Sequence, residues 1–164
     1  MAIAEAMVEL EGVLSELVPA VARLSTLLVD QRQAVATGDL ARLLSLTTEQ
    51  EEAAARLAHL DQRRARLQAD LEAALGVRGL CALAEAAIAS DTRREEFLAI
   101  TRELLRATVA LHEEHERATA LLGAAIEVCL RTRGYLHRVA GQAPPYSAAV
   151  GYSPPPQAPL PGGP

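Results

Sequence analysis

Residues 3–28 read IAEAMVELEGVLSELVPAVARLSTLL, and apolar side chains recur in this stretch at alternating steps of four and three residues. A spacing that averages about 3.5 residues keeps one apolar stripe on a single side of a helix, where it can pack against a partner helix. The stripe consists of Ile3, Met7, Leu10, Leu14, Leu17, Val21, Leu24 and Leu28. The chain is therefore expected to be a protein of long packed helices.

The same spacing returns twice, with a few polar residues on the stripe. One stripe consists of Leu43, Leu46, Gln50, Ala53, Leu57, Leu60, Arg64, Leu67 and Leu71. The other consists of Phe97, Thr101, Leu104, Thr108, Leu111, His115, Ala118, Leu122, Ala125 and Cys129. Together the three stripes predict an all-α fold: an elongated antiparallel helical bundle or coiled-coil hairpin of three long helices plus one short helix.

Turn and capping residues set the expected boundaries. Gly38 suits the left-handed end of a helix and Asp39 suits the N-cap of the next one, while Ser90 opens a helix start that Glu95 supports. The connection after residue 37 is short enough to require an antiparallel hairpin. Pro19 lies inside the first helix, where we expect a kink. The expected helices are residues 2–36, 40–75, 80–89 and 92–138.

The chain changes character at Gly141. Eight of its nine prolines follow that residue, so residues 141–164 are expected to be a flexible Pro/Gly-rich tail. The expected domain organisation is thus a helical bundle over residues 1–140 and this tail.

Composition narrows the class of protein. The 16 basic residues are all Arg, the net charge is −5, and the Arg side chains are dispersed among carboxylates, which argues against a nucleic-acid partner. No signal peptide and no long apolar run are apparent, so we expect a cytoplasmic location without membrane insertion. Cys81 and Cys129 are interpreted as small buried apolar residues, because two cysteines do not make a disulfide framework.

A search for chemistry finds one candidate cluster, the segment His112 to Glu116. Its two histidines are three residues apart, which does not match a zincin motif, and the other stripes carry no Asp or Glu to complete a metal site. We expect no enzyme activity, no metal and no cofactor. The polar stripe residues Gln50, Arg64 and His115 have two interpretations that stay open: they set helix register, or they flank a binding groove.

The last long helix carries more apolar residues than its stripe needs. Leu98, Leu105 and Ile126 lie on one flank of the stripe, and Ile100, Leu121, Val128 and Tyr135 lie on the other. Because a thin bundle has little material to cover a second layer, part of this surplus should be exposed as a partner-binding or self-association surface. The expected anchors are Leu98, Leu105, Leu121, Ile126 and Val128.

Several short blocks resemble the flagellar export chaperone family FlgN. They are Leu27-Leu28-x-x-Gln31-x-x-Ala34, Gly38-Asp39-Leu40-x-x-Leu43, Leu46-Thr47-x-x-Gln50-Glu51 and Arg56-Leu57-x-x-Leu60, then Arg102-Glu103-Leu104-Leu105, and finally Tyr146 followed by Gly151. The order of the expected elements is also similar to that family over nearly the whole chain.

The resemblance implies a cytosolic chaperone of the flagellar type III export system. Its clients would be hook-filament junction proteins, whose amphipathic C-terminal segments it would hold until delivery to the cytosolic domain of the export gate. Tyr146 resembles the residue with which this family docks on the gate. The alternative is a structural coiled-coil adaptor or oligomeric scaffold without a flagellar client; a homo-oligomer is compatible with either interpretation.

Overall fold

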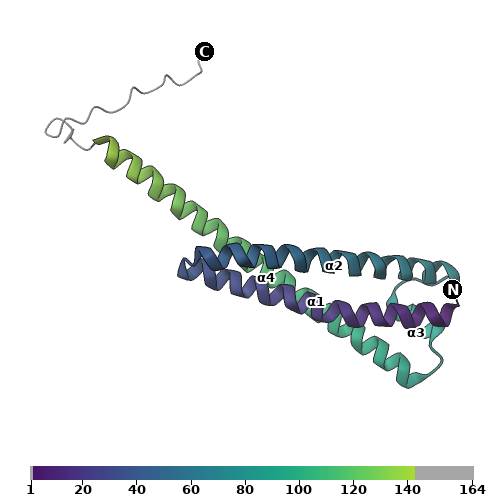
Figure 1. Cartoon of the computed structure of the whole chain (residues 1–164). Helices are drawn as coiled ribbons and strands as arrows, with labels where there is room; N and C mark the ends of the chain where they lie inside the picture. The colour runs from purple at the N-terminus through teal and green to yellow at the C-terminus, as the bar shows by residue number, and fades with distance from the viewer. Residues whose placement is uncertain (1, 143–164) are drawn as a thin grey trace, which may run out of the picture. The chain divides into compact units, whose positions relative to one another are not determined.

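The computed structural model describes residues 2–142, with side chains through residue 139. The described residues form four helices and no strand, as the sequence predicted (Figure 1). The helices are α1 (Ile3–Thr37), α2 (Leu40–Leu75), α3 (Leu80–Ala87) and α4 (Asp91–Gln142). Internal contacts divide the chain after Ala125. Residues 1–125 are the bundle unit, and residues 126–142 are the C-terminal helical segment.

α1 and α2 form an antiparallel hairpin whose turn depends on two residues. Gly38 has a φ of 70° and its backbone N–H donates to the carbonyls of Ala34 and Val35, which ends α1. The Asp39 side chain then accepts a hydrogen bond of 2.9 Å from the backbone N–H of Arg42, which caps α2. The predicted turn is therefore confirmed, with the physical roles expected of a glycine C-cap and an aspartate N-cap.

Ion pairs fix the direction of the long helices within the bundle unit. Glu9 pairs with Arg63 at 2.8 Å and Arg23 with Glu49 at 2.7 Å, so each step forward along α1 is matched by a step back along α2. α4 runs parallel to α1 in the bundle unit and antiparallel to α2. Two ion pairs show this direction: Glu11 lies 3.4 Å from Arg93, and Arg32 lies 2.7 Å from Glu114. Both pairs join residues 82 positions apart, so a step forward along α1 is matched by a step forward along α4.

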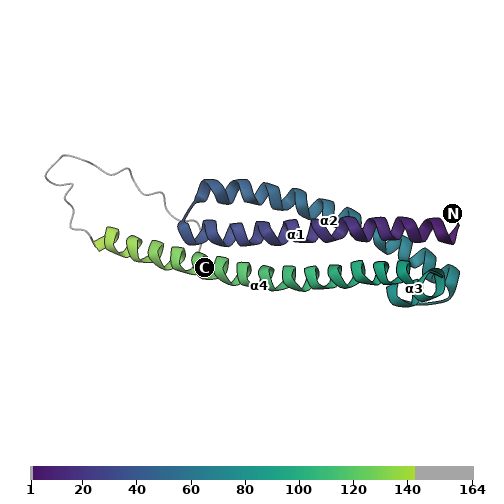
Figure 2. The ribbon, with the colours of Figure 1, turned by 90° about the horizontal axis from the view of Figure 1, so that it is seen from below.

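The main core of the bundle unit lies at the end where α3 packs. Figure 2 shows α3 beside the start of α4. Here α3 adds a fourth helix to the packing, with Leu83 and Ala84 fully buried, and Phe97 at the start of α4 is fully buried against them. Other buried members of this core are Met7, Leu10, Val13, Leu14 and Leu17 on α1 and Leu60, Leu67 and Leu71 on α2. A second, smaller core of Leu27, Ala34 and Leu46 holds the hairpin together near its turn.

The observed helix ends differ little from the sequence boundaries, with two exceptions. α3 ends at Ala87 rather than near residue 89, and α4 extends to Gln142 rather than 138. α1 is one uninterrupted helix through the exposed Pro19. The proposed division into a bundle and a tail after residue 140 stays a prediction, since residues 143–164 lie outside the described part.

The expected burial of the two cysteines is wrong. Cys81 and Cys129 are both exposed. Cys81 is the second residue of α3, and the buried side of that helix is formed by Leu83 and Ala84 instead. Cys129 lies in the C-terminal helical segment, where no described residue is buried.

Among the described helices, only α1 is long and apolar enough to cross a membrane, judged by length and composition alone. Its most apolar 18-residue window has a mean hydropathy of 1.5, and 33% of that window is buried inside the protein. α1 contains ten buried residues and α2 contains four, so the composition of α1 is that of the central helix of a bundle.

Candidate protein-binding groove

Beyond the reach of α3, the three long helices of the bundle unit leave an open groove along α1. The groove consists of two adjoining hollows of about 480 and 710 Å³, which share Ala54, Thr108 and Leu111 as lining residues. The smaller hollow begins at Leu17, where the main core ends, and the larger one continues to Gln31.

The groove is apolar because the stripes that the sequence assigned to helix packing line it; on α1, Leu17, Val21 and Leu28 are buried beneath it and Leu24 is partly exposed. Its floor is the α1 stripe from Leu17 through Val21 and Leu24 to Leu28. α2 forms one wall and α4 forms the other. The main lining residues of the walls are Gln50, Ala54, Leu57 and Arg64 on α2, and Leu104, Thr108, Leu111, His115 and Leu122 on α4.

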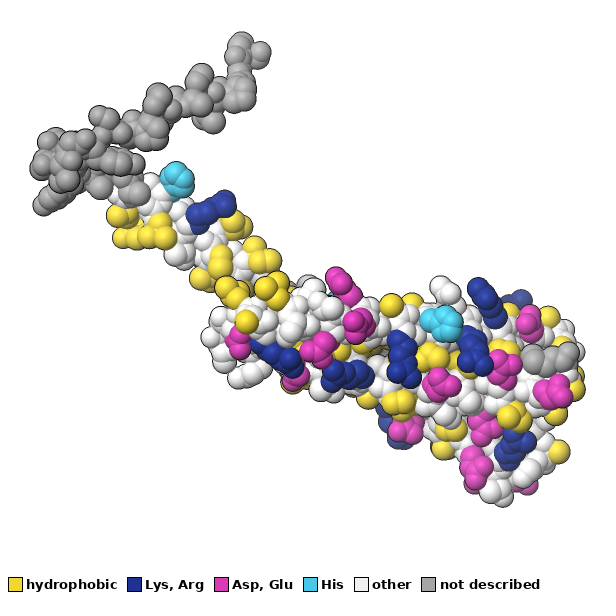
Figure 3. Space-filling view, in the orientation of Figure 1, with side chains coloured by type: hydrophobic (Ala, Val, Ile, Leu, Met, Phe, Trp, Pro, Cys, Tyr) yellow, Lys and Arg dark blue, Asp and Glu magenta, His cyan; other side chains and the backbone are white. Residues whose placement is uncertain are grey.

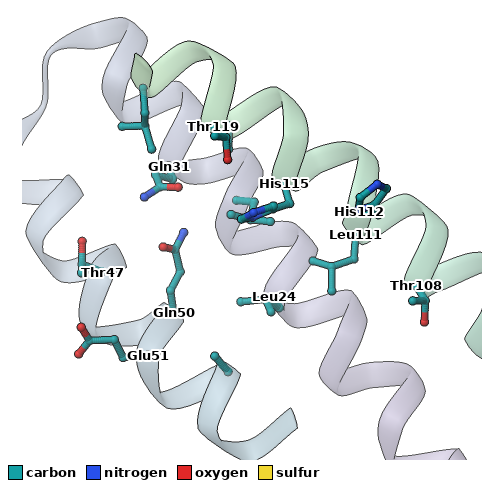
Figure 4. Close-up of a pocket in the computed structure, with 14 residues that line it drawn as sticks. Leu24, Gln31, Thr47, Gln50, Glu51, Thr108, Leu111, His112, His115 and Thr119 are labelled. Carbon is teal, nitrogen blue, oxygen red and sulfur yellow. The ribbon is translucent and has the colours of Figure 1, made fainter. Parts of the chain in front are cut away.

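The three polar stripe residues all line this groove. Gln50 extends from α2 toward Gln31, and its side-chain nitrogen donates to the carbonyl of Leu27 at 3.2 Å (Figure 4). Arg64 donates to Asp61 at 2.8 Å and to Gln68 at 2.7 Å. His115 extends from α4 over α1 in the same view. All three residues therefore line the groove, and both interpretations, register setting and flanking of a binding groove, stay predictions.

Charge is distributed unevenly along the groove. In the larger hollow Glu51 is the lone lining carboxylate and no Arg lines the wall. Glu51 makes no ion pair within the described part of the chain. An uncompensated carboxylate at the edge of an apolar groove favours an occupant with a basic residue on that side.

An ion pair joins α1 to α4 beside the larger hollow. Arg32 Nη2 lies 2.7 Å from Glu114 Oε2, and the Glu114 side chain is only 14% exposed. Glu114 also pairs with Arg117, and this carboxylate is the main reason that the pKa of Arg117 is raised. Because Arg32 and Glu114 bridge the floor and one wall, they hold the α4 wall in place.

The C-terminal helical segment is a second apolar surface. Every residue from 126 to 139 is exposed, although the segment contains six large apolar side chains (Figure 3). They are Ile126, Val128, Leu130, Tyr135, Leu136 and Val139. Val128, Tyr135 and Val139 share one face because they are spaced by seven and four residues.

The structure separates the predicted client-binding residues into two groups. Leu105, Ile126 and Val128 are 65%, 59% and 62% exposed and are therefore accessible to a partner. Leu98 and Leu121 are only partly exposed, and Leu98 packs against the main core. Tyr146, the predicted gate-docking residue, lies outside the described residues. The client-binding role of all five α4 residues stays a prediction.

Sequence reasoning raised Gln50 and Arg64 of α2 as possible groove residues but missed the contribution of α1 to the groove. Leu24 and Leu28 were assigned to packing, because a heptad stripe on a helix does not show whether one neighbour or two cover it. The available signal was the set of polar residues on the other stripes, which mark where a stripe faces solvent.

The described residues show no group of three or more His, Cys, Asp or Glu side chains suited to a metal ion. In the predicted cluster, His112 Nε2 lies 3.4 Å from Glu116 Oε1, and both side chains are exposed on α4.

The fold is a helical bundle whose long helices leave an apolar groove, an arrangement that other proteins use to bind an amphipathic helix. The chain matches the FlgN protein family over residues 2–153 and belongs to that family. No curated protein and no solved structure matched the chain. Members of this family are cytoplasmic flagellar export chaperones that bind hook-associated proteins, and they are not enzymes.

Proposed function

We propose that this chaperone holds the amphipathic C-terminal segment of a hook-filament junction protein, prevents its premature assembly and delivers it to the export gate. The observation that carries the proposal is the position of the exposed apolar residues. Of the thirteen large apolar side chains that are exposed among the residues whose burial is described, eight lie on α4, and Leu105, Ile126 and Val128 are among them.

The physical basis is the match between two amphipathic helices. A client helix with apolar residues at positions i, i+3, i+4 and i+7 can cover these α4 side chains. Because the client segment must become ordered when it binds, part of the interaction free energy is lost, roughly 2–5 kcal/mol or more. The resulting affinity is moderate, which suits a chaperone that has to release its cargo.

The proposal is tested with charged substitutions on α4. Ile126→Asp and Val128→Asp should each weaken binding of a junction protein's C-terminal peptide by about tenfold or more, since hot-spot truncations cost about 2 kcal/mol. Leu105→Asp tests the same surface within the bundle unit. Isothermal titration calorimetry measures the affinity, and circular dichroism establishes that each variant is folded.

Leu40→Asp and Leu44→Asp are matched controls, because these side chains are 73% and 74% exposed at the start of α2. Both should bind the peptide as the wild type does. Equal affinity for all variants would place the client site elsewhere on the chain.

Delivery is proposed to involve Tyr146. An aromatic side chain with a polar hydroxyl suits a docking element in a proline-rich segment. The support is the family match, which extends to residue 153 and so includes this tyrosine.

A further inference from the structure

One chain of this protein presents two apolar surfaces without a partner among the described residues. The first is the groove along α1 in the bundle unit, and the second is the C-terminal helical segment. A groove between helices accepts a helix, and an apolar helix requires a groove, so the two surfaces have complementary shapes.

The lengths of the two surfaces agree. The groove floor runs from Leu17 to Gln31 on α1, which is about 21 Å at a rise of about 1.5 Å per residue. Residues 126–139 of the segment, calculated in the same way, are about 20 Å long. A single helix of this length would occupy both hollows of the groove.

The charges are also complementary. The segment carries Arg131, Arg133 and Arg138 against the single carboxylate of Glu127, which pairs with Arg131. Arg133 and Arg138 make no ion pair within residues 2–142. The larger hollow has the opposite character, since Glu51 is its lone charged lining residue.

The occupant has to come from another molecule. α4 is one helix from Asp91 to Gln142, and its earlier part already forms a wall of the groove. The segment of the same chain would enter its own groove only if α4 broke near residue 125, with the loss of backbone hydrogen bonds. A segment from a second copy enters as an intact helix.

We propose that two copies of this chain form a symmetric dimer in which the C-terminal helical segment of each copy occupies the α1 groove of the other. The exchange is reciprocal, so each contact is made twice, as expected for an isologous interface. Each exchanged helix is about 20 Å long and about 10 Å wide. Counting the area buried on the helix and on the groove, for both copies, gives a total interface on the order of 1,000 Å².

The dimer has a consequence for client binding, and this part rests on the proposed function. Val128, one of the proposed client anchors, lies on the same face of the exchanged segment as Tyr135 and Val139. The second copy therefore covers Val128 in the resting chaperone, and a client segment has to compete with it.

The first test is the molar mass of the full chain in solution. Light scattering after size exclusion should give twice the chain mass of 17.4 kDa at micromolar concentrations. Leu24→Asp on the groove floor and Tyr135→Asp on the segment should each raise the dimer Kd about a hundredfold, since each removes a central apolar contact. Glu51→Arg, which reverses the charge at the groove edge, should raise the dimer Kd about tenfold. Leu44→Asp, at a residue outside the groove, is the control and should stay dimeric.

The second test mixes the two monomeric variants. Leu24→Asp chains retain an intact segment, and Tyr135→Asp chains retain an intact groove, so one groove–segment contact can form only in the mixture. A tagged Leu24→Asp chain should therefore capture untagged Tyr135→Asp chain, more weakly than wild-type chains associate.

Three results would overturn the proposal: a monomeric wild type at about 100 µM, far above the Kd expected of a standard interface; a dimer that survives either substitution; or no association in the mixture. A monomeric wild type whose client binding is lost with Leu24→Asp would assign the groove to the client instead. None of these mass measurements needs a client, so a failure of the proposed function would show separately, in the peptide titrations.

Discussion

At the scale of single residues, Glu72 shows how one side chain ties two helices together. Its carboxylate accepts hydrogen bonds from Gln68 Nε2 at 2.7 Å and from the backbone N–H of Gly79 at 2.8 Å. The pKa of Glu72 is lowered, mainly by the Gln68 hydrogen bond and then by Gly79, with a smaller effect from Arg78. The turn between α2 and α3 is thus held by a charged acceptor, because ionised acceptors make the stronger hydrogen bonds.

This pKa shift predicts a pH-dependent stability. A lowered folded-state pKa stabilises the fold above the unfolded pKa of about 4.3, and this contribution is lost as the pH falls through the folded value. Glu72→Gln should therefore lower the melting temperature at pH 7, and the difference from wild type should shrink below about pH 4. Thermal melts at both pH values measure it; Glu52→Gln, an exposed α2 residue, is the control. A difference that is the same at both pH values would mean that the charge of Glu72 has no role.

At the scale of elements, the short helix α3 decides where the bundle is closed. Leu83, Ala84 and Phe97 are fully buried where α3 meets the long helices, and the groove begins where that contact ends. The sequence predicted α3 and the start of α4 from local signals. It did not predict that an eight-residue helix would fill the bundle at one end only, because that depends on which helices it contacts.

The closed end should carry most of the stability of the bundle unit. Phe97→Ala removes a fully buried ring and should cost roughly 3–5 kcal/mol. Leu105→Ala, on the same helix but 65% exposed, should stay within about 0.5 kcal/mol of wild type. Urea denaturation measures both values. A similar loss of unfolding free energy in the two variants would show that α4 contributes to stability through its helix propensity rather than through the burial of Phe97 in this core.

At the scale of the whole molecule, the described residues hold the proposed binding surfaces, whereas the proposed docking residue, Tyr146, lies beyond them. The bundle unit and the C-terminal helical segment carry the groove and the exposed apolar helix, and Tyr146 follows in the proline-rich part of the chain. The proposed functions of cargo binding and delivery thus fall on different parts of the sequence.

This separation leads to a prediction for delivery. Tyr146→Ala should bind the client peptide normally and lose affinity for the cytosolic domain of the export gate by about tenfold, as expected for removal of an aromatic anchor. Biolayer interferometry with the purified gate domain measures the change. Tyr152→Ala is the matched control in the same region. A variant ending at Gly141 should melt close to the wild-type temperature. Unchanged gate binding by Tyr146→Ala would remove this residue from the proposed mechanism.

The sequence by itself determined the four helices, their order and most of their ends. Stripe spacing, Gly38, Asp39 and the glycines after α2 act through the local backbone, so they can be interpreted without knowing the fold. The resemblance to the FlgN family was also carried by such short local blocks, and the family match confirmed it.

Only the tertiary structure decided which parts of each stripe are buried. Phe97 on the α4 stripe is buried in the core that α3 completes, whereas Thr108 and His115 on the same stripe are exposed in the groove wall. Cys81 and Cys129 were expected inside and lie outside for the same reason. The physical reason is that burial depends on what occupies the space opposite a side chain. In this bundle α3 occupies that space at one end, and along the groove the described chain leaves it open.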